Sequence, residues 1–232
     1  MSDQKYIIDF QPKEAQIAQI NIWMIEENKK RTGLVHDLSI LSYHAEKNTF
    51  ATITTANETI GFVTWDTFKR GGHISVAAVA AEHRRSGVGC YLIETLFAYL
   101  LEKGILALYL ECAPATSEKF WRKLGFKKMP PIDGYFNGDT PRLYKCLLPT
   151  QETGVSNGSY IQVYEWGNAK KMRWPLHYKP NTNELLQPII QPVSGDWCIE
   201  HIISEIPKQS EKIKNFRSGS YLDDPFLIIT AL

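Results

Sequence analysis

Residues 81–89 read Ala-Glu-His-Arg-Arg-Ser-Gly-Val-Gly, a basic turn with two glycines between two apolar segments. The segment before it, Ile74–Ala80, has the composition of a strand, and the segment after it, Cys90–Leu101, has that of a helix. The first N–H groups of a helix lack intrahelical acceptors, and the helix dipole there favours an anion. Glycines allow the backbone to approach a phosphate closely, and the arginines add positive charge. The sequence therefore predicts a pyrophosphate site at this turn.

The elements around the turn have an α/β order. After it, the patterns predict a strand at Leu106–Cys112, a helix that ends in Gly-Phe at Ser117–Phe126, and a last core strand at Arg142–Leu148. Before it, they predict a strand, two helices and a hairpin, followed by a turn at Gly71-Gly72. These elements are Tyr6–Phe10, Lys13–Lys30, His36–Ala45, and the hairpin strands Phe50–Thr55 and Thr59–Phe68.

The pattern Arg84-x-x-Gly87-x-Gly89 resembles the acyl-CoA signature of the GNAT acetyltransferase superfamily, Gln/Arg-x-x-Gly-x-Gly/Ala. Ser117–Phe126 is similar to the ending Phe-Tyr-x-x-x-Gly-Phe of that family, and Arg142–Leu148 fits its last core strand. The resemblance covers about residues 1–148. It implies an α/β, GNAT acyl-CoA-binding fold, which is a mixed and mostly antiparallel sheet flanked by helices. The alternative is an unrelated β–α–β unit with an incidental basic turn.

The chain after Leu148 has a different composition. A polar, turn-rich stretch up to Ser159 indicates a boundary, which predicts an acetyltransferase domain at 1–150 and a β-rich extension of unknown role at 158–232. Its large apolar residues predict an ordered segment rather than a disordered tail. Strands are expected at Tyr160–Trp166, Met172–Tyr178, Leu185–Val193, Trp197–Ile203 and Phe226–Thr230. Pro188 and Pro192 argue against a regular central strand.

Bulk properties narrow the functional class. The 232 residues carry a formal net charge of +1, so no general attraction to nucleic acid or membranes is expected. No apolar run has the length of a membrane span, and the polar start lacks a signal-peptide core. The four cysteines are widely separated and form no Cys-x-x-Cys pair. We therefore expect reduced cysteines, no metal, and a cytoplasmic location.

The resemblance implies that acetyl-CoA, a cosubstrate, lies in a V-shaped opening between the strands Ile74–Ala80 and Leu106–Cys112. The pantetheine arm would pair with strand backbone, and the Ala77 N–H is the candidate oxyanion donor. The predicted cofactor-binding residues are Ala77, Ala78, Val79, Arg84, Arg85, Ser86, Gly87, Val88, Gly89 and Ser117. The alternatives are core packing for the alanines and solvated surface charge for each arginine.

His73 is the candidate general base. It lies fourteen positions before Gly87, where histone acetyltransferases of the superfamily carry a catalytic glutamate. Imidazole can accept a proton near neutral pH. The alternative is an exposed turn histidine after the two glycines. Glu82 and Glu111 are further carboxylates near the predicted opening.

The general acid departs from the family pattern, because Trp121 stands where many members have tyrosine. Indole has an N–H donor but no usable acidic proton. Either the thiolate leaves without that acid, or another group such as Ser117 or Tyr144 supplies the proton. The alternatives are a helix N-cap for Ser117 and strand packing for Tyr144.

The molecule that would accept the acetyl group is the feature that the sequence determines least. Four aromatic residues could line its pocket or pack in the core, namely Trp65, Phe68, Tyr135 and Phe136. The leading hypothesis is an N-acetyltransferase that acts on an amine-bearing small molecule or protein by direct attack in a ternary complex. The alternative is a non-catalytic CoA-binding module that recruits a protein partner through the extension. A homodimer is compatible with either hypothesis.

Overall fold

The computed structural model describes residues 6–29, 39–56, 58–130, 140–155, 158–165, 171–193, 196–215, 220–223 and 225–232. The chain forms two compact units. The first contains almost all of the chain up to Lys145. The second contains Cys146–Leu232 and the short turn Phe68–Gly71. The division after Lys145 lies near the boundary predicted at residue 150.

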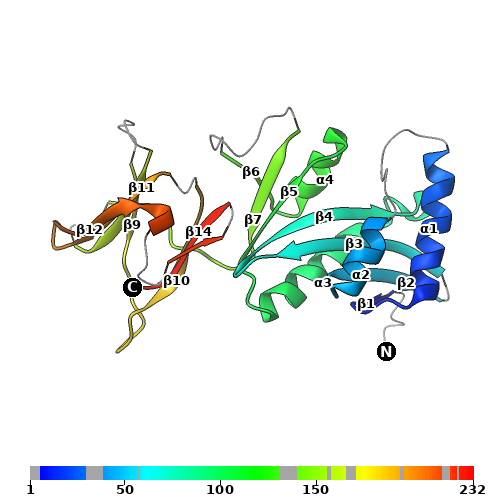
Figure 1. Ribbon diagram of the computed structural model, residues 1–232, viewed down its shortest axis with the longest axis horizontal. Helices are drawn as coiled ribbons and strands as arrows, with labels where there is room; N and C mark the ends of the chain where they lie inside the picture. Colours follow the sequence, from blue (N-terminus) through cyan, green and yellow to red (C-terminus); the bar gives the residue numbers. More distant parts are fainter. Residues whose placement is uncertain are drawn as a thin grey trace. The chain divides into compact units, whose positions relative to one another are not determined.

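The first unit is built on a seven-stranded sheet with the order β1-β2-β3-β4-β5-β7-β6 (Figure 1). Its strands are β1 (Ile7–Asp9), β2 (Phe50–Thr55), β3 (Glu58–Thr67), β4 (Gly71–Val79), β5 (Ala107–Glu111), β6 (Lys127–Lys128) and β7 (Arg142–Cys146). The pairs β1–β2, β2–β3, β3–β4 and β6–β7 are antiparallel. The predicted α/β fold with a mostly antiparallel sheet is confirmed.

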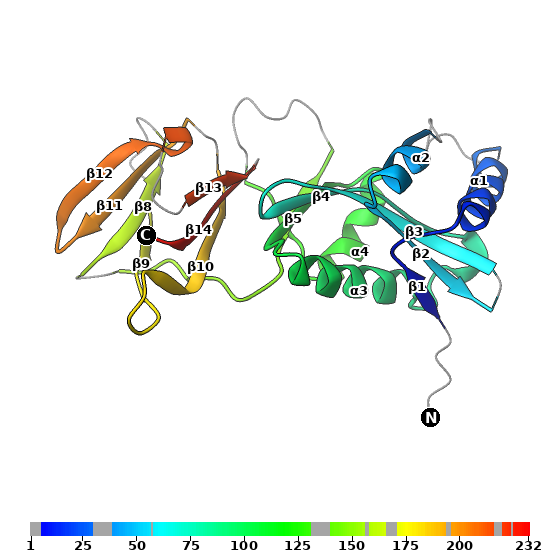
Figure 2. The same cartoon turned by 60° about the horizontal axis from the view of Figure 1, so that its bottom comes forward.

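Helices cover both faces of this sheet. They are α1 (Glu14–Asn28), α2 (Ser39–Glu46), α3 (Val88–Glu102) and α4 (Glu118–Lys123), with 3-10 turns η1 (Ala81–His83) and η2 (Ala115–Ser117). Figure 2 shows α1 and α2 on one face and α3 on the other. On the side of α1 and α2, a hydrophobic core cluster is formed by Ile20, Met24, Leu41, Phe50 and Phe62. Helix α3 buries a stripe at helical spacing, namely Val88, Leu92, Ile93, Leu96 and Leu100.

Strand β4 contains a β-bulge that the sequence analysis did not predict. Thr64 pairs with Val76, whereas the next residue, Trp65, pairs with Ile74. Ser75 is therefore the extra residue on β4. A bulge interrupts the alternation of side chains, so the residues on its two sides present their side chains to the sheet faces in a shifted order. The bulge lies between the candidate base His73 and the candidate oxyanion donor Ala77.

The turn predicted at Gly71-Gly72 lies earlier in the chain, at Phe68–Gly71, where the Phe68 N–H donates to the Gly71 carbonyl oxygen at 2.9 Å. Both glycines open β4, and Gly72 pairs with Thr67. A Cβ on Gly72 would lie 2.9 Å from the Leu108 side chain and 3.0 Å from the Asp66 carbonyl oxygen. Glycine is therefore required here by a close approach of strands.

The second unit contains two antiparallel sheets. The four-stranded sheet has the order β12-β11-β8-β9, and the three-stranded sheet has the order β10-β14-β13. Their strands are β8 (Tyr160–Tyr164), β9 (Met172–Pro175), β10 (Glu184–Pro192), β11 (Cys198–Ile203), β12 (Ile206–Lys212), β13 (Ser220–Asp223) and β14 (Phe226–Ala231). A further 3-10 turn, η3, spans Ile213–Asn215. The shared core includes Ile161, Val163, Trp174, Ile199, Leu227 and Ile229. The predicted β-rich extension is confirmed.

Two details of this unit differ from the sequence-based expectation. Strands β12 and β13 were not predicted, since β12 is mostly polar and has no apolar run. Strand β10 is regular only in part, because its pairing with β14 shifts register between Glu184 and Ile189, where Pro188 lies. It occupies an edge of its sheet, which is where proline is tolerated.

The last residue predicted for the first helix, Lys30, and the first residue predicted for the second, His36, lie outside the described residues. Among the helices that the structure describes, none has both the length and the apolar character needed to cross a membrane.

Candidate functional site

The turn before α3 has an unusual backbone. Arg85 has φ +63° and Gly87 has φ +89°, so two nearly adjacent residues adopt left-handed conformations. Gly87 is the N-cap of α3, and no side chain caps the helix there. A Cβ on Gly87 would meet nothing within 4 Å, so its backbone angle, and not space, is the reason for glycine.

This backbone presents a row of N–H groups. The first helical hydrogen bond of α3 runs from the Tyr91 N–H to the Gly87 carbonyl oxygen, at 3.0 Å. Among the described residues, none accepts a hydrogen bond from the N–H groups between Arg85 and Cys90. The stretch Arg85–Gly87 is exposed. Successive N–H groups around left-handed residues form an anion-binding concavity, and the α3 dipole adds to its positive potential.

Arg84 makes a different contact from the phosphate contact that the sequence predicts. Its Nη2 lies 2.8 Å and 2.5 Å from the two carboxylate oxygens of Glu27 on α1, and its Nε donates to the Val79 carbonyl oxygen at 2.6 Å. The Ala81 N–H donates to the same Glu27 carboxylate at 3.1 Å. Arg84 would have to leave this pair to reach a phosphate, whereas Arg85 is exposed.

Strand β4 is unusually accessible for an inner strand. Its residues from Ser75 to Val79 are only partly buried. Ala78 packs against the core cluster under α1 and α2, as the core-packing alternative expects. A Cβ on Gly61 of β3 would lie 2.9 Å from the Ala78 carbonyl oxygen, so β3 and β4 approach closely at this point. The V-shaped opening between β4 and β5, which are neighbours in the sheet, stays a prediction.

Gly89, the second glycine of the motif, has a different environment from Gly87. A Cβ on Gly89 would lie 3.4 Å from two carbons of the Phe120 ring and 3.7 Å from the Val79 side chain. These are ordinary van der Waals distances, so space alone does not require glycine at this position. Ser86 does not cap α3, because its hydroxyl donates to the His83 carbonyl oxygen at 2.6 Å.

His73 lies inside β4 and is partly buried, so its assignment to an exposed turn is wrong. Its ring stacks on Tyr109 of β5 with centroids 4.6 Å apart and planes 30° from parallel. Burial lowers the pKa of His73, and the negative charges of Asp66 and Glu111 oppose this shift. The net direction is downward, so the imidazole is mainly neutral at neutral pH and has a lone pair that can accept a proton.

Asp66 and Glu111 are each held in place. Asp66 pairs with His73 across β3 and β4, and the Ser75 hydroxyl donates to Asp66 Oδ2 at 2.9 Å. Glu111 lies at the end of β5. Its Oε1 accepts a hydrogen bond from Arg142 Nε at 2.9 Å and lies 2.8 Å from Arg142 Nη2. Four strands therefore contribute to one polar group around His73.

Sequence reasoning missed Asp66, Tyr109 and Arg142. A signal existed for Asp66, because it lies in the predicted strand Thr59–Phe68, which only a short turn separates from His73. The bulge at Ser75 lies farther from the turn than the Asp66–His73 pair, so it leaves the register of that pair unchanged.

Ser117 does not act as an N-cap, since its side chain makes no capping hydrogen bond to α4. Its hydroxyl instead bonds to the Cys112 thiol, which works against the burial that raises the pKa of this cysteine. Trp121 is only 7% exposed and packs between Phe120 and Phe126, with ring centroids 5.0 Å and 5.4 Å away.

Tyr144 is partly buried in β7, opposite Lys127 of β6. The contacts of the three predicted catalytic residues thus involve different neighbours: Tyr109 for His73, Cys112 for Ser117 and the β6 strand for Tyr144.

The proposed aromatic lining of an acceptor pocket is only partly described. Trp65 is a core residue that is 2% exposed and packs edge-on against Phe10 and Tyr99. Phe68 is 40% exposed. Tyr135 and Phe136 lie outside the described residues.

The four cysteines differ in burial. Cys112 and Cys198 are buried, Cys90 and Cys146 are partly buried, and none of the four is joined in a disulfide. The helix, turn and strands around Arg84–Gly89 bring together, within one unit, N–H groups without an acceptor among the described residues, an accessible strand and a neutral imidazole.

Comparisons with known proteins agree with this geometry. The model of the acetyltransferase (GNAT) family matches residues 14–126. No curated protein matches the sequence. Among solved structures, Ard1 from Thermoplasma volcanium is 22% identical, covers 62% of this chain and 99% of its own, and has a TM-score of 0.50.

Two further structures have similar scores. N-acetylglutamate synthase from Neisseria gonorrhoeae, complexed with coenzyme A and N-acetyl-glutamate, is 16% identical over 62% of this chain and 35% of its own, with a TM-score of 0.52. An acetyltransferase of the GNAT family from Staphylococcus aureus is 12% identical over 62% of this chain and 99% of its own, with a TM-score of 0.51. At these identities the likeness concerns the fold.

Proposed function

Because residues 14–126 form a domain of the acetyltransferase (GNAT) family, we propose that this protein transfers an acetyl group from acetyl-CoA to an amine by direct attack in a ternary complex. The observation that carries the proposal is the turn before α3, where the N–H groups from Arg85 to Cys90 have no acceptor among the described residues. A pyrophosphate supplies the acceptors and the negative charge that such a turn favours.

The residues of the turn divide the work of holding the pyrophosphate. The backbone of Arg85–Gly89 donates hydrogen bonds, and the exposed Arg85 side chain adds a charge-assisted contact. Arg84 supports the site indirectly, because its ion pair with Glu27 anchors the turn to α1. The pantetheine arm follows β4, where Ala77, Ala78 and Val79 are small or partly buried. The Ala77 N–H is the proposed donor to the developing oxyanion.

His73 is the proposed general base. The amine must lose a proton to become the nucleophile, and a neutral imidazole accepts it. Burial keeps the pKa of His73 low enough for the neutral form, while Asp66 and Glu111 favour the imidazolium that forms when the proton arrives. Asp66 is in turn held by Ser75.

The departing thiolate benefits from a proton. Trp121 is packed between aromatic rings and has no acidic proton to give. Ser117 is the proposed donor, since its hydroxyl lies at the end of β5 beside Cys112 and is not used as a helix cap. Tyr144 is the second candidate.

A non-catalytic CoA-binding module is the competing function. The observation that favours it is Trp121, which removes the usual acid, together with a second unit that has its own core and could recruit a protein. Both functions predict CoA binding, so binding alone does not separate them.

Turnover decides between the two functions. Labelled acetyl-CoA would be incubated with a panel of amino acids, polyamines and peptides bearing free amines, with the His73→Ala variant as the matched control. Acetylation that requires His73 supports the enzyme. Calorimetric CoA binding without acetylation of any member of the panel favours the module, and absence of CoA binding contradicts both.

A further inference from the structure

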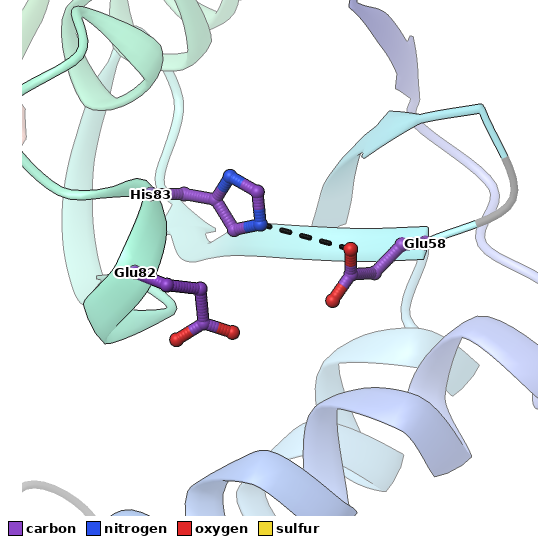
Figure 3. Close-up of side chains that lie close together, drawn as sticks. All are labelled: Glu58, Glu82 and His83. Atoms are coloured by element: carbon purple, nitrogen blue, oxygen red, sulfur yellow. Dashed lines mark ion pairs between the residues drawn. The ribbon is translucent and has the colours of Figure 1, made fainter.

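Three metal-ligating side chains converge at the entrance to the turn. Glu58 opens β3, and Glu82 and His83 belong to η1. Their ligand atoms all lie within 4.8 Å of one another. In Figure 3 the His83 ring points toward Glu58, and the Glu82 carboxylate extends on the same side. Two elements that are distant in sequence thus place an imidazole and two carboxylates together.

Among the described residues, the one ion pair of this group is internal to it. His83 Nε2 lies 3.7 Å from Glu58 Oε2. Within the described part of the chain, no lysine or arginine forms an ion pair with Glu58 or Glu82. Two carboxylates at this separation repel each other. A divalent cation between them removes the repulsion and matches their combined charge.

The backbone that carries these side chains is well anchored. Glu58 pairs with Thr55 in the β2–β3 hairpin. In η1, the His83 N–H donates to the Ala80 carbonyl oxygen at 2.9 Å, and the Ala81 N–H donates to Glu27 at 3.1 Å. The fold therefore holds the backbone of the three residues in place, and only their side chains have to be ordered when an ion binds.

We propose that Glu58, Glu82 and His83 form a binding site for a first-row divalent cation of the Zn²⁺ type. An imidazole favours Zn²⁺ and its neighbours in the series over Mg²⁺ or Ca²⁺, and carboxylates complete the charge. Two donors that each lie about 2.1 Å from a tetrahedral Zn²⁺ are about 3.4 Å apart. The ligand atoms here lie within 4.8 Å of one another, so side-chain rotation has to bring them closer. Glu58 is free to rotate, since its side chain is 60% exposed.

Three protein donors leave at least one position of a tetrahedral ion for water. This site is separate from acetyl transfer, because none of its three residues belongs to the proposed catalytic group. Its position matters nevertheless. His83 immediately precedes Arg84, and its carbonyl oxygen accepts the Ser86 hydroxyl, so a bound ion would hold the start of the anion-binding turn.

The test is calorimetric titration of the untagged, full-length protein with ZnCl₂, supported by visible absorption after addition of Co²⁺. We expect one ion per chain and a tetrahedral Co²⁺ spectrum. His83→Ala and Glu58→Gln should each lower the Zn²⁺ affinity by about tenfold or more. His177→Ala, which removes an exposed histidine of the second unit, should leave the affinity unchanged.

Circular dichroism would establish that each variant is folded, and Glu58→Gln preserves side-chain size if His83→Ala does not fold. The proposal is overturned if the wild-type protein binds no stoichiometric Zn²⁺. It is also overturned if both folded variants bind Zn²⁺ as tightly as the wild type. Neither result bears on CoA binding, so the proposed acetyl transfer is tested separately.

Discussion

Arg84 and Glu27, which are 57 positions apart in the sequence, form an ion pair. A single nitrogen of Arg84, Nη2, lies 2.8 Å and 2.5 Å from the two carboxylate oxygens of Glu27. The pair connects the start of the anion-binding turn to α1. It changes the expected role of the arginine in the signature, because its charge is used to shape the turn. The phosphate contacts proposed here come instead from backbone N–H groups and Arg85.

This relationship predicts that Glu27→Gln weakens both the fold and the binding of CoA. Loss of a partly buried, charge-assisted pair should lower the free energy of unfolding by about 1–2 kcal/mol. The CoA affinity should fall severalfold because the turn loses its anchor. Urea denaturation and calorimetric titration measure the two effects. Glu26→Gln is the matched control, since Glu26 forms an exposed ion pair with Lys29 of the same helical stretch at 2.6 Å. Equal behaviour of the two variants would contradict the anchoring role.

Gly87→Asp should remove CoA binding. It places a carboxylate at the anion-binding turn, and it forces an L residue into a left-handed conformation at φ +89°. Gly104→Asp separates these effects, because Gly104 has φ +82° and open space around it at the other end of α3. Both variants should lose similar stability, about 1–2 kcal/mol. Only Gly87→Asp should lose about tenfold or more in CoA affinity by calorimetry, which corresponds to about 1.4 kcal/mol. Unchanged affinity would exclude the turn as the pyrophosphate site.

The pH dependence of turnover should report His73. The neutral imidazole is the active form, so the rate should fall as the pH drops through the pKa of His73, which lies below 6.5. Asp66→Asn removes a charge that raises this pKa, and the acid limb of kcat/KM should therefore move to lower pH. Asp9→Asn, on the edge strand β1, should leave the limb in place. A limb that does not move in Asp66→Asn would show that another group titrates.

Ser117→Ala should reduce kcat by about tenfold or more if its hydroxyl protonates the departing thiolate. The CoA affinity should change little, and Tyr144→Phe should have a smaller effect on kcat. Steady-state kinetics with a thiol-detecting reagent measure all three variants. A larger loss in Tyr144→Phe would assign the proton to the tyrosine.

The second unit should unfold when its core is opened. Leu227 is fully buried in β14, whereas Leu186 on β10 is 57% exposed. Leu227→Ala should lower the free energy of unfolding by about 2–5 kcal/mol. Leu186→Ala, the same chemical change, should stay within about 0.5 kcal/mol of the wild type. Equal stability of the two variants would mean that this core is not cooperative.

The sequence by itself determined the strand, the basic turn and the helix around Arg84–Gly89, as well as most strands of both units. These features depend on local requirements. A periodic apolar pattern selects helix or strand, and a left-handed N-cap such as Gly87 requires glycine. The family resemblance follows from the same local motifs, which is why the fold of the first unit could be predicted.

Only the tertiary structure decided how the site residues meet. The Arg84–Glu27 pair and the position of Asp66 opposite His73 depend on strand register and helix docking. Beyond that pair, the bulge at Ser75 shifts the register of β3 and β4 by one residue, and the side chain of Ser75 gives no local sign of it. The polar strand β12 forms because β11 offers it a hydrogen-bonding edge, not because of its own sequence pattern. Contacts between distant segments are chosen by the packing energy of the whole chain, so short-range patterns do not reveal them.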